Sequence, residues 1–159
     1  MTRDEFIEAY GGIYEHSPWV AADAFDSAGR VPDIGELRSA LAAAVDRADT
    51  ARQLALVRAH PDLAGRAAIR GELTADSTSE QASAGIDQCT PAEFERFQEL
   101  NEAYKAKFGF PFVMAVRKSN RREILQAFAV RLDNDYDDEF ATAIAEIHKI
   151  AALRLEAAH

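Results

Sequence analysis

Histidine is the side chain whose ordinary pKa lies near neutrality, so it is the first candidate for acid–base chemistry. The chain contains four histidines: His16, His60, His148 and His159. No two of them have the spacing of paired metal ligands on a helix or in a zinc finger. The sequence therefore predicts no metal site, and it leaves proton transfer as the chemistry that a histidine would perform.

His60 differs from the other histidines because Pro61 follows it. A residue before proline is biased away from the α conformation, so the helix preceding this pair is expected to end near Ala59. The helix dipole would then favour the protonated imidazole of His60. Two interpretations stay open at this point: a proton donor or shuttle, and a histidine that caps the last carbonyl groups of the helix.

A polar segment that includes Ser77 and Glu80 contains a carboxylate that could assist a histidine. Ser77 and Glu80 have the spacing of a capping box, which predicts a helix that begins at Ser77. The exposed amide groups at a helix N-terminus also bind anions, so this segment could equally take part in a site. In that case Glu80 would polarise an imidazole.

Arg154 interrupts the apolar face of the last predicted helix, between Leu153 and Leu155. An arginine in such a position usually lies at the polar border, with its aliphatic stem packed and its charged head in water. If it points inward, its planar guanidinium offers a fork that matches a carboxylate. Spacing alone does not bring Arg154 together with His60 and Glu80.

Helical signals cover almost the whole chain. Capping residues and apolar side chains three or four positions apart predict helices near residues 2–11, 17–29, 37–45, 50–59, 77–85, 90–109, 119–128 and 136–155. Residues 110–116 are continuously apolar and too short for a helix after Pro111, so they are expected to form a buried extended segment. The sequence has no alternating strand pattern and no repeat, which predicts an all-α fold with one compact multi-helix domain over residues 1–159.

Composition restricts the partners and the location. The chain has 18 Lys and Arg against 27 Asp and Glu, a net charge of −9, so phosphate backbones would repel it and no nucleic acid partner is expected. No apolar run approaches the roughly 20 residues that span a bilayer, and the first residues lack the features of a signal peptide, so no membrane partner is expected. Cys89 is the only cysteine, which favours a reducing compartment and predicts a cytoplasmic protein.

Three linked motifs resemble the family of 2-oxo-4-hydroxy-4-carboxy-5-ureidoimidazoline (OHCU) decarboxylases. They are His-Pro-Asp-Leu-Ala-Gly at residues 60–65, Ser-Thr-Ser-Glu-Gln at residues 77–81, and Asn-Glu-Ala-Tyr at residues 101–104 leading to Phe-Gly-Phe-Pro-Phe at residues 108–112. Their order and spacing match the family as well. The likeness runs from the first predicted helix to Arg154 and Leu155, which is practically the whole chain.

The resemblance implies an all-helical carboxy-lyase of urate breakdown. Such an enzyme decarboxylates OHCU to (S)-allantoin and needs no metal or bound cofactor. The small-molecule substrate would be its principal partner. Independently of the resemblance, an acidic helical protein of this size could pair as a homodimer through an exposed apolar helix face.

The family's functional residues carry over to positions of this sequence. His60 corresponds to the catalytic histidine, Glu80 to its acidic partner and Arg154 to the arginine that holds the substrate carboxylate. The substrate-binding positions implied by the resemblance are Pro61, Ser77, Gln81 and the backbone of Phe112, Val113, Met114, Ala115 and Val116. His60, paired with Glu80, is expected to polarise or deprotonate the substrate hydroxyl and to help turn the carboxylate out of the ring plane.

Two other functions compete with the decarboxylase. The first is a non-catalytic helical module that binds a ureido or purine-like ligand; it would retain the apolar wall at residues 110–112 but lose the acid pair, whereas His60 and Glu80 are both present. The second is hydrolysis of 5-hydroxyisourate, an activity of a transthyretin-like β fold, and this sequence has no β-sandwich pattern. The decarboxylase is therefore the preferred prediction.

Overall fold

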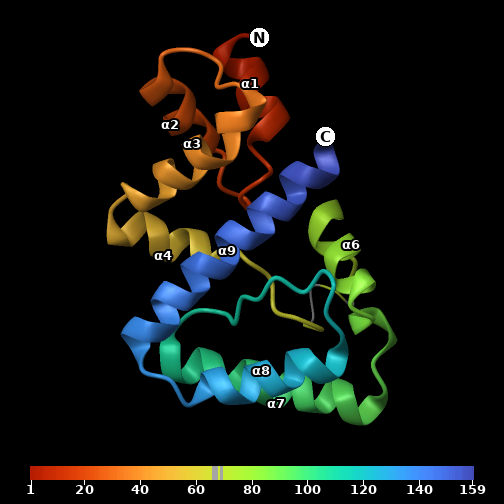
Figure 1. Cartoon of the computed structure of the whole chain (residues 1–159). Helices are drawn as coiled ribbons and strands as arrows, with labels where there is room; N and C mark the ends of the chain where they lie inside the picture. Colours follow the sequence, from red (N-terminus) through yellow and green to blue (C-terminus); the bar gives the residue numbers. More distant parts are fainter. Residues whose placement is uncertain (66–67, 69) are drawn as a thin grey trace. The chain divides into compact units, whose positions relative to one another are not determined.

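The computed structural model describes residues 1–65, 68 and 70–159, and all the regular elements among them are helical. This confirms the all-α prediction. The elements, labelled in Figure 1, are α1 (Arg3–Tyr10), α2 (Trp19–Ala28), α3 (Ile34–Asp46), α4 (Thr50–Arg58), α6 (Ala75–Ser83), a 3-10 turn (Ile86–Gln88), α7 (Pro91–Phe108), α8 (Arg121–Leu132) and α9 (Tyr136–Ala158).

The chain forms two compact units. The first contains residues 1–60 and 147–159, and the second contains residues 61–146, so α9 contributes to both. The predicted single domain over residues 1–159 stays a prediction, which a single cooperative unfolding transition would support. None of the helices in the described ranges is long and apolar enough to cross a membrane.

In the first unit, capping side chains set the helix starts. The Thr2 hydroxyl accepts a hydrogen bond from the Glu5 amide at 3.2 Å, and the Asp49 carboxylate accepts one from the Arg52 amide at 2.8 Å. The helix α4 ends at Arg58 with Ala59 as its C-cap, as the proline at position 61 predicts. The end of α4 therefore places residue 60 directly beyond a helix C-terminus. The large apolar side chains of this unit that are fully enclosed are Phe6, Leu41, Leu56 and Ile147.

In the second unit, α7 begins at a capping box, in which the side chains of Thr90 and Glu93 each bind the other's backbone amide, at 3.1 and 3.0 Å. Gly109 ends this helix with a φ of 75°, a left-handed conformation that glycine adopts without strain. The cap of α8 is Asn120, whose side-chain oxygen accepts a hydrogen bond from the Glu123 amide at 3.0 Å. Both helices thus have well-defined starts.

Aromatic rings form the core of the second unit. Phe112 stacks on Phe128 with ring centroids 3.9 Å apart, and Tyr104 contacts both rings edge-on. This packing holds residues 110–116, which form neither helix nor strand and are buried except for two half-buried positions. The predicted apolar, non-helical segment is therefore present.

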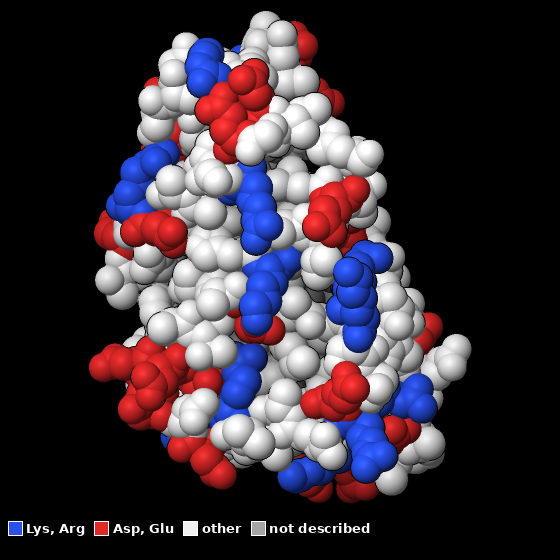
Figure 2. All heavy atoms as spheres, in the orientation of Figure 1, with Lys and Arg blue, Asp and Glu red and all other residues white. Residues whose placement is uncertain are grey.

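The surface carries charges of both signs. Figure 2 shows acidic and basic side chains interspersed on the face in view. The excess of nine acidic charges in the sequence is therefore not expressed as one uniformly acidic surface there.

Candidate active site

His60 lies at the end of α4 and is only 8% exposed. Its Nδ1 donates a hydrogen bond to the Leu56 carbonyl at 2.9 Å, which assigns the proton to Nδ1 and leaves Nε2 as an acceptor in the neutral ring. Burial lowers the pKa of His60 from 6.5 to about 4. The helix end acts in the expected direction, because the hydrogen bond to the Leu56 carbonyl raises the pKa of His60, but burial lowers this pKa by more.

Arg154 points into the first unit and is 5% exposed, so the inward alternative is the one observed. Its Nη2 donates to Glu15 Oε2 at 3.0 Å, and its Nη1 donates to the carbonyls of Gly12 and Ile13 at 3.3 and 3.4 Å. The guanidinium is thus oriented by a carboxylate and two backbone carbonyls.

Glu15 is a residue that the sequence analysis missed. It lies between α1 and α2, is 1% exposed, and pairs with Arg154. Its charge raises the pKa of His60, whereas the charge of Arg154 lowers it. The first unit therefore groups an imidazole, a guanidinium and a carboxylate that influence one another.

In the second unit, α6 presents three of the predicted site residues on one face. Ser77, Glu80 and Gln81 are spaced three and four positions apart and are 4%, 9% and 5% exposed. The predicted start at Ser77 is wrong: the helix begins at Ala75, and the hydroxyl of Thr74 accepts from the Ser77 amide at 3.1 Å. Ser77 and Glu80 are thus side chains of the helix interior rather than a capping box.

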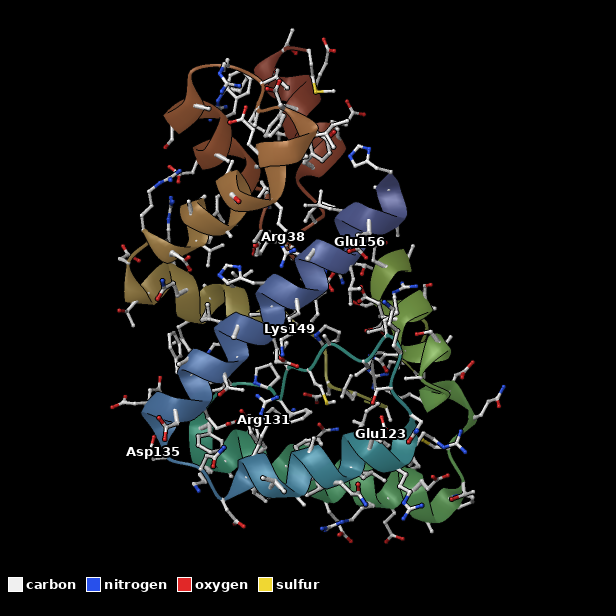
Figure 3. All side chains as sticks on the ribbon, in the orientation of Figure 1. Arg38, Glu123, Arg131, Asp135, Lys149 and Glu156 are labelled. Carbon is white, nitrogen blue, oxygen red and sulfur yellow. The ribbon has the colours of Figure 1, made fainter. Side chains whose placement is uncertain are left out.

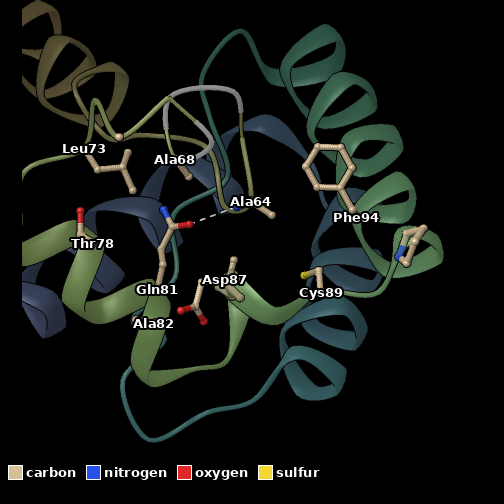
Figure 4. A pocket seen from close by; sticks show the side chains of 12 residues that line it. Ala64, Ala68, Leu73, Thr78, Gln81, Ala82, Asp87, Cys89 and Phe94 are labelled. Carbon is tan, nitrogen blue, oxygen red and sulfur yellow. Dashed lines mark hydrogen bonds between the residues drawn. The ribbon is translucent and has the colours of Figure 1, made fainter.

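Gln81 links α6 to the motif that begins at residue 60. Its Oε1 accepts from the Ala64 amide at 3.1 Å, and its Nε2 donates to the Asp62 carbonyl at 3.2 Å; the first bond is drawn in Figure 4. The Asn101 amide of α7 donates to the Leu63 carbonyl at 2.9 Å. Residues of all three sequence motifs therefore meet here, around the chain that directly follows Pro61.

A pocket of about 530 Å³ opens beside this contact, and Figure 4 shows it from close by. Most of its lining is apolar, with the polar groups of Thr78, Gln81, Asp87 and Cys89 among it. Burial raises the pKa of the Cys89 thiol, which disfavours the nucleophilic thiolate. This pocket is therefore a space for apolar groups rather than a nucleophilic centre.

The backbone strip at residues 112–116 is held by charged side chains. Val113 accepts through its carbonyl from Arg131 Nη1 at 2.6 Å, and the Ala115 amide donates to Glu146 Oε1 at 3.2 Å. Figure 3 shows Arg131 pointing from α8 toward this strip. Two backbone groups of the strip are thus engaged by the protein itself.

The predicted pairing of His60 with Glu80 stays a prediction, because the two residues belong to different units. Within the described ranges, no group of three or more His, Cys, Asp or Glu side chains is arranged to hold a metal ion. What the structure brings together is His60 with Arg154 and Glu15 in the first unit, and Gln81 with the chain after Pro61 in the second.

These features describe an all-helical protein with a buried imidazole and a buried, fixed guanidinium. Residues 1–156 match the family model described as OHCU decarboxylase. The chain therefore belongs to the OHCU decarboxylase family.

Individual relatives agree with this assignment. A 2-oxo-4-hydroxy-4-carboxy-5-ureidoimidazoline decarboxylase of Haloferax volcanii is 49% identical over 98% of this chain and 89% of its own length. A crystal structure of (S)-allantoin synthase superposes with a TM-score of 0.77 at 33% identity, over 99% of this chain and 51% of that one. An OHCU decarboxylase crystallised in the presence of (S)-allantoin shares the fold, with a TM-score of 0.72 at 23% identity over 96% and 94% of the two chains.

Proposed function

We propose that this protein is a carboxy-lyase that converts OHCU to (S)-allantoin and carbon dioxide in urate degradation. The match to the family over residues 1–156 is the observation that carries the proposal. The relative from Haloferax volcanii, which is named for this reaction, is similar over nearly the whole of both chains.

The substrate itself can accept the electrons that decarboxylation releases. Its carboxylate is attached to a ring carbon that also bears a hydroxyl and adjoins a carbon–nitrogen double bond. When the bond to the carboxylate breaks, its electron pair forms a double bond between the two ring carbons. The electrons of the carbon–nitrogen double bond move to the ring nitrogen, which takes up a proton. The hydroxyl then loses its proton to become a carbonyl, and the carbon bearing the ureido group gains one. The balance is one carboxylate and one proton consumed, with carbon dioxide and allantoin formed. We therefore propose that the reaction proceeds without a cofactor.

In this mechanism His60 is the base. Its imidazole is neutral at pH 7 because burial lowers its pKa to about 4, and its Nδ1 is occupied by the Leu56 carbonyl, so Nε2 can accept the proton of the substrate hydroxyl. We assign to Glu80 the role of stabilising the imidazolium that results, and to Arg154 the role of holding the carboxylate through its planar fork. His60 and Arg154 would together help to turn the carboxylate out of the ring plane.

The binding roles follow the same assignment. Ser77 and Gln81 lie on the same side of α6. Gln81 also binds the backbone that follows Pro61, and this contact would shape the site around the substrate ring. We assign the ring and ureido hydrogen bonds to backbone groups of residues 112–116. Protonation from one face of a substrate held in this way would give a single enantiomer.

Two further proposals concern assembly and location. Val130 and Tyr136 are 67% and 46% exposed although they are large and apolar or aromatic, which supports a homodimer; light scattering at several protein concentrations would test it. The single cysteine supports a cytoplasmic location, which fractionation of the source cells would test.

The reaction can be tested by generating the substrate in place. Urate, urate oxidase and 5-hydroxyisourate hydrolase are combined, and circular dichroism is followed with and without this protein. We expect optically active allantoin to appear at a rate proportional to the protein concentration. Slow, racemic allantoin with and without folded protein would contradict the proposal and favour a non-catalytic ligand-binding module.

A further inference from the structure

The loop between α1 and α2 is built to direct Glu15 inward. His16, the next residue, has a φ of 48°, in the left-handed region that residues other than glycine adopt rarely. Its imidazole is exposed, whereas Glu15 is 1% exposed. The Ser17 hydroxyl donates to the Glu15 carbonyl at 2.9 Å and fixes the backbone on the other side of His16. Backbone strain beside a buried carboxylate makes Glu15 a candidate for a functional role.

This loop is attached to α9 at two points six residues apart. The Tyr14 hydroxyl lies 2.7 Å from His148 Nδ1, and His148 Nε2 lies 3.0 Å from Asp46 Oδ1. The second attachment is the 3.0 Å bond between Glu15 and Arg154. Because Tyr14 is fixed through its side chain, its neighbour Glu15 has little freedom to leave Arg154. Two neighbouring residues of the loop, Tyr14 and Glu15, are therefore both bonded to α9.

Arg154 is held from the loop through both of its terminal nitrogens. Nη2 binds Glu15, and Nη1 lies 3.3 and 3.4 Å from the carbonyls of residues 12 and 13. The two carbonyl contacts are long and involve uncharged acceptors, so Glu15 supplies the strongest bond of the three. Removal of the Glu15 charge would take this charge-assisted bond away from a guanidinium that is only 5% exposed.

Decarboxylation makes the charge near the substrate carboxylate important. The carboxylate is negative in the bound substrate, and that charge moves into the ring as carbon dioxide forms. A cation beside the carboxylate therefore stabilises the substrate more than the transition state, which raises the barrier. An arginine whose charge is partly offset by a buried carboxylate can orient the substrate through hydrogen bonds with less of this penalty.

We propose that Glu15 is a positioning residue for decarboxylation: it holds Arg154 in place for the substrate carboxylate and offsets its charge so that the carboxylate can leave as carbon dioxide. This inference rests on the proposed function and on the role assigned there to Arg154. It adds a residue that acts through Arg154 and does not itself touch the substrate.

Glu15 also affects His60 through its charge. In the first unit the groups that act on the imidazole are Glu15 and His16 from the loop, Arg154 from α9 and the Leu56 carbonyl of α4. Glu15 raises the pKa of His60 against the lowering effects of burial, Arg154 and His16. Without the charge of Glu15, the pKa of His60 falls further, and the acidic limb of the kcat/KM profile moves to lower pH.

The decisive variant is Glu15→Gln, which keeps the shape of the side chain and removes its charge. We expect kcat to fall by about tenfold or more and KM to fall as well, since the carboxylate is held more tightly in the ground state. Calorimetry would compare two probes, neutral (S)-allantoin and its ring-opened anion allantoate. The affinity of Glu15→Gln for allantoate should exceed that of the wild type by about threefold or more. Its affinity for (S)-allantoin should stay within about twofold of the wild-type value.

A matched control is Glu8→Gln, the same substitution at an exposed position of α1. It should leave kcat, KM and both affinities unchanged. The inference is overturned if Glu15→Gln retains the wild-type kcat, or if the variant loses affinity for both probes equally with an unmoved pH profile, as a merely structural role would give.

Two provisions keep the test decisive. If Glu15→Gln does not fold, Glu15→Asp is used instead, which retains the charge but withdraws it by one methylene. For this variant kcat should fall severalfold, while the ratio of the affinities for allantoate and (S)-allantoin stays unchanged. A wild-type kcat would overturn the inference.

If the wild-type protein does not decarboxylate OHCU, the proposed function fails. The ratio of allantoate to (S)-allantoin affinity in Glu15→Gln then tests whether Glu15 offsets Arg154.

Discussion

Arg131 and Glu139 form an ion pair of 2.8 Å inside the second unit, where the two side chains are 10% and 0% exposed. The same Glu139 oxygen accepts from the Tyr104 hydroxyl at 2.6 Å, and burial raises the pKa of that tyrosine. The Arg131 guanidinium also lies over the Phe112 ring, 4.3 Å from its centroid. One buried pair thus connects α7, α8 and α9 with the backbone strip at residues 112–116.

Glu139→Gln should destabilise the protein strongly. The substitution leaves the charge of Arg131 buried without its counter-charge, which costs about 3–5 kcal/mol in comparable pairs. Urea denaturation at pH 7 would measure the change in the free energy of unfolding. Glu95→Gln, at an exposed position of α7, serves as the control and should change it by less than about 0.5 kcal/mol. Equal decreases in the free energy of unfolding of the two variants would show that the buried pair stabilises the protein no more than an exposed charge does.

The cap of α6 can be located by substitution. Thr74→Ala should lower the free energy of unfolding by about 1 kcal/mol, because the Ser77 amide loses the hydroxyl that lies 3.1 Å away. Thr74→Ser retains that oxygen and should recover most of the loss. Ser79→Ala, exposed on the same helix, should have little effect in the same denaturation experiment. An unchanged stability of Thr74→Ala would place the start of the helix elsewhere.

The stability of the protein should fall as the solution is acidified from pH 6.5 to pH 4. The pKa of His60 is about 4 in the folded protein and near its ordinary value of 6.5 in the unfolded chain, so only the unfolded chain takes up this proton in that interval. The contribution is about 3 kcal/mol, fully present above pH 6.5 and lost as the pH falls toward 4. His60→Asn removes it, so the difference in unfolding free energy between wild type and variant should shrink on acidification. A difference that is the same at pH 7 and pH 4 would contradict the lowered pKa.

Local features of the fold followed from the sequence. Proline at position 61 predicts the end of α4, and the Thr90–Glu93 spacing predicts the start of α7, because each signal acts within one turn of the chain. The predicted start of α6 was wrong because the same residue spacing fits two interpretations. Ser77 could cap a helix or lie on its buried face, and the packing of the second unit decides for the buried face.

The charge state and partners in the site could not be predicted in the same way. The protonation of His60 depends on burial, which is a property of the folded unit and reverses the effect expected from the helix end alone. Glu15 lies outside any helix, and Arg154 is 139 positions away in the chain. A single sequence contains no signal at such a separation, so the pair became visible only in the structure.

The most direct test measures both reaction products and asks whether their formation depends on His60. OHCU labelled with ¹³C in its carboxyl group is generated enzymatically. In the same sample, the release of labelled carbon dioxide and the circular dichroism of allantoin are recorded, first with the wild-type protein and then with His60→Asn. With the wild type, we predict that both signals rise together at a rate proportional to the protein concentration and that the allantoin is the S enantiomer. His60→Asn should lower this rate by about 100-fold or more while remaining folded. Release of carbon dioxide at the protein-free rate with racemic allantoin in the wild-type sample, or near-normal turnover by His60→Asn, would contradict the account.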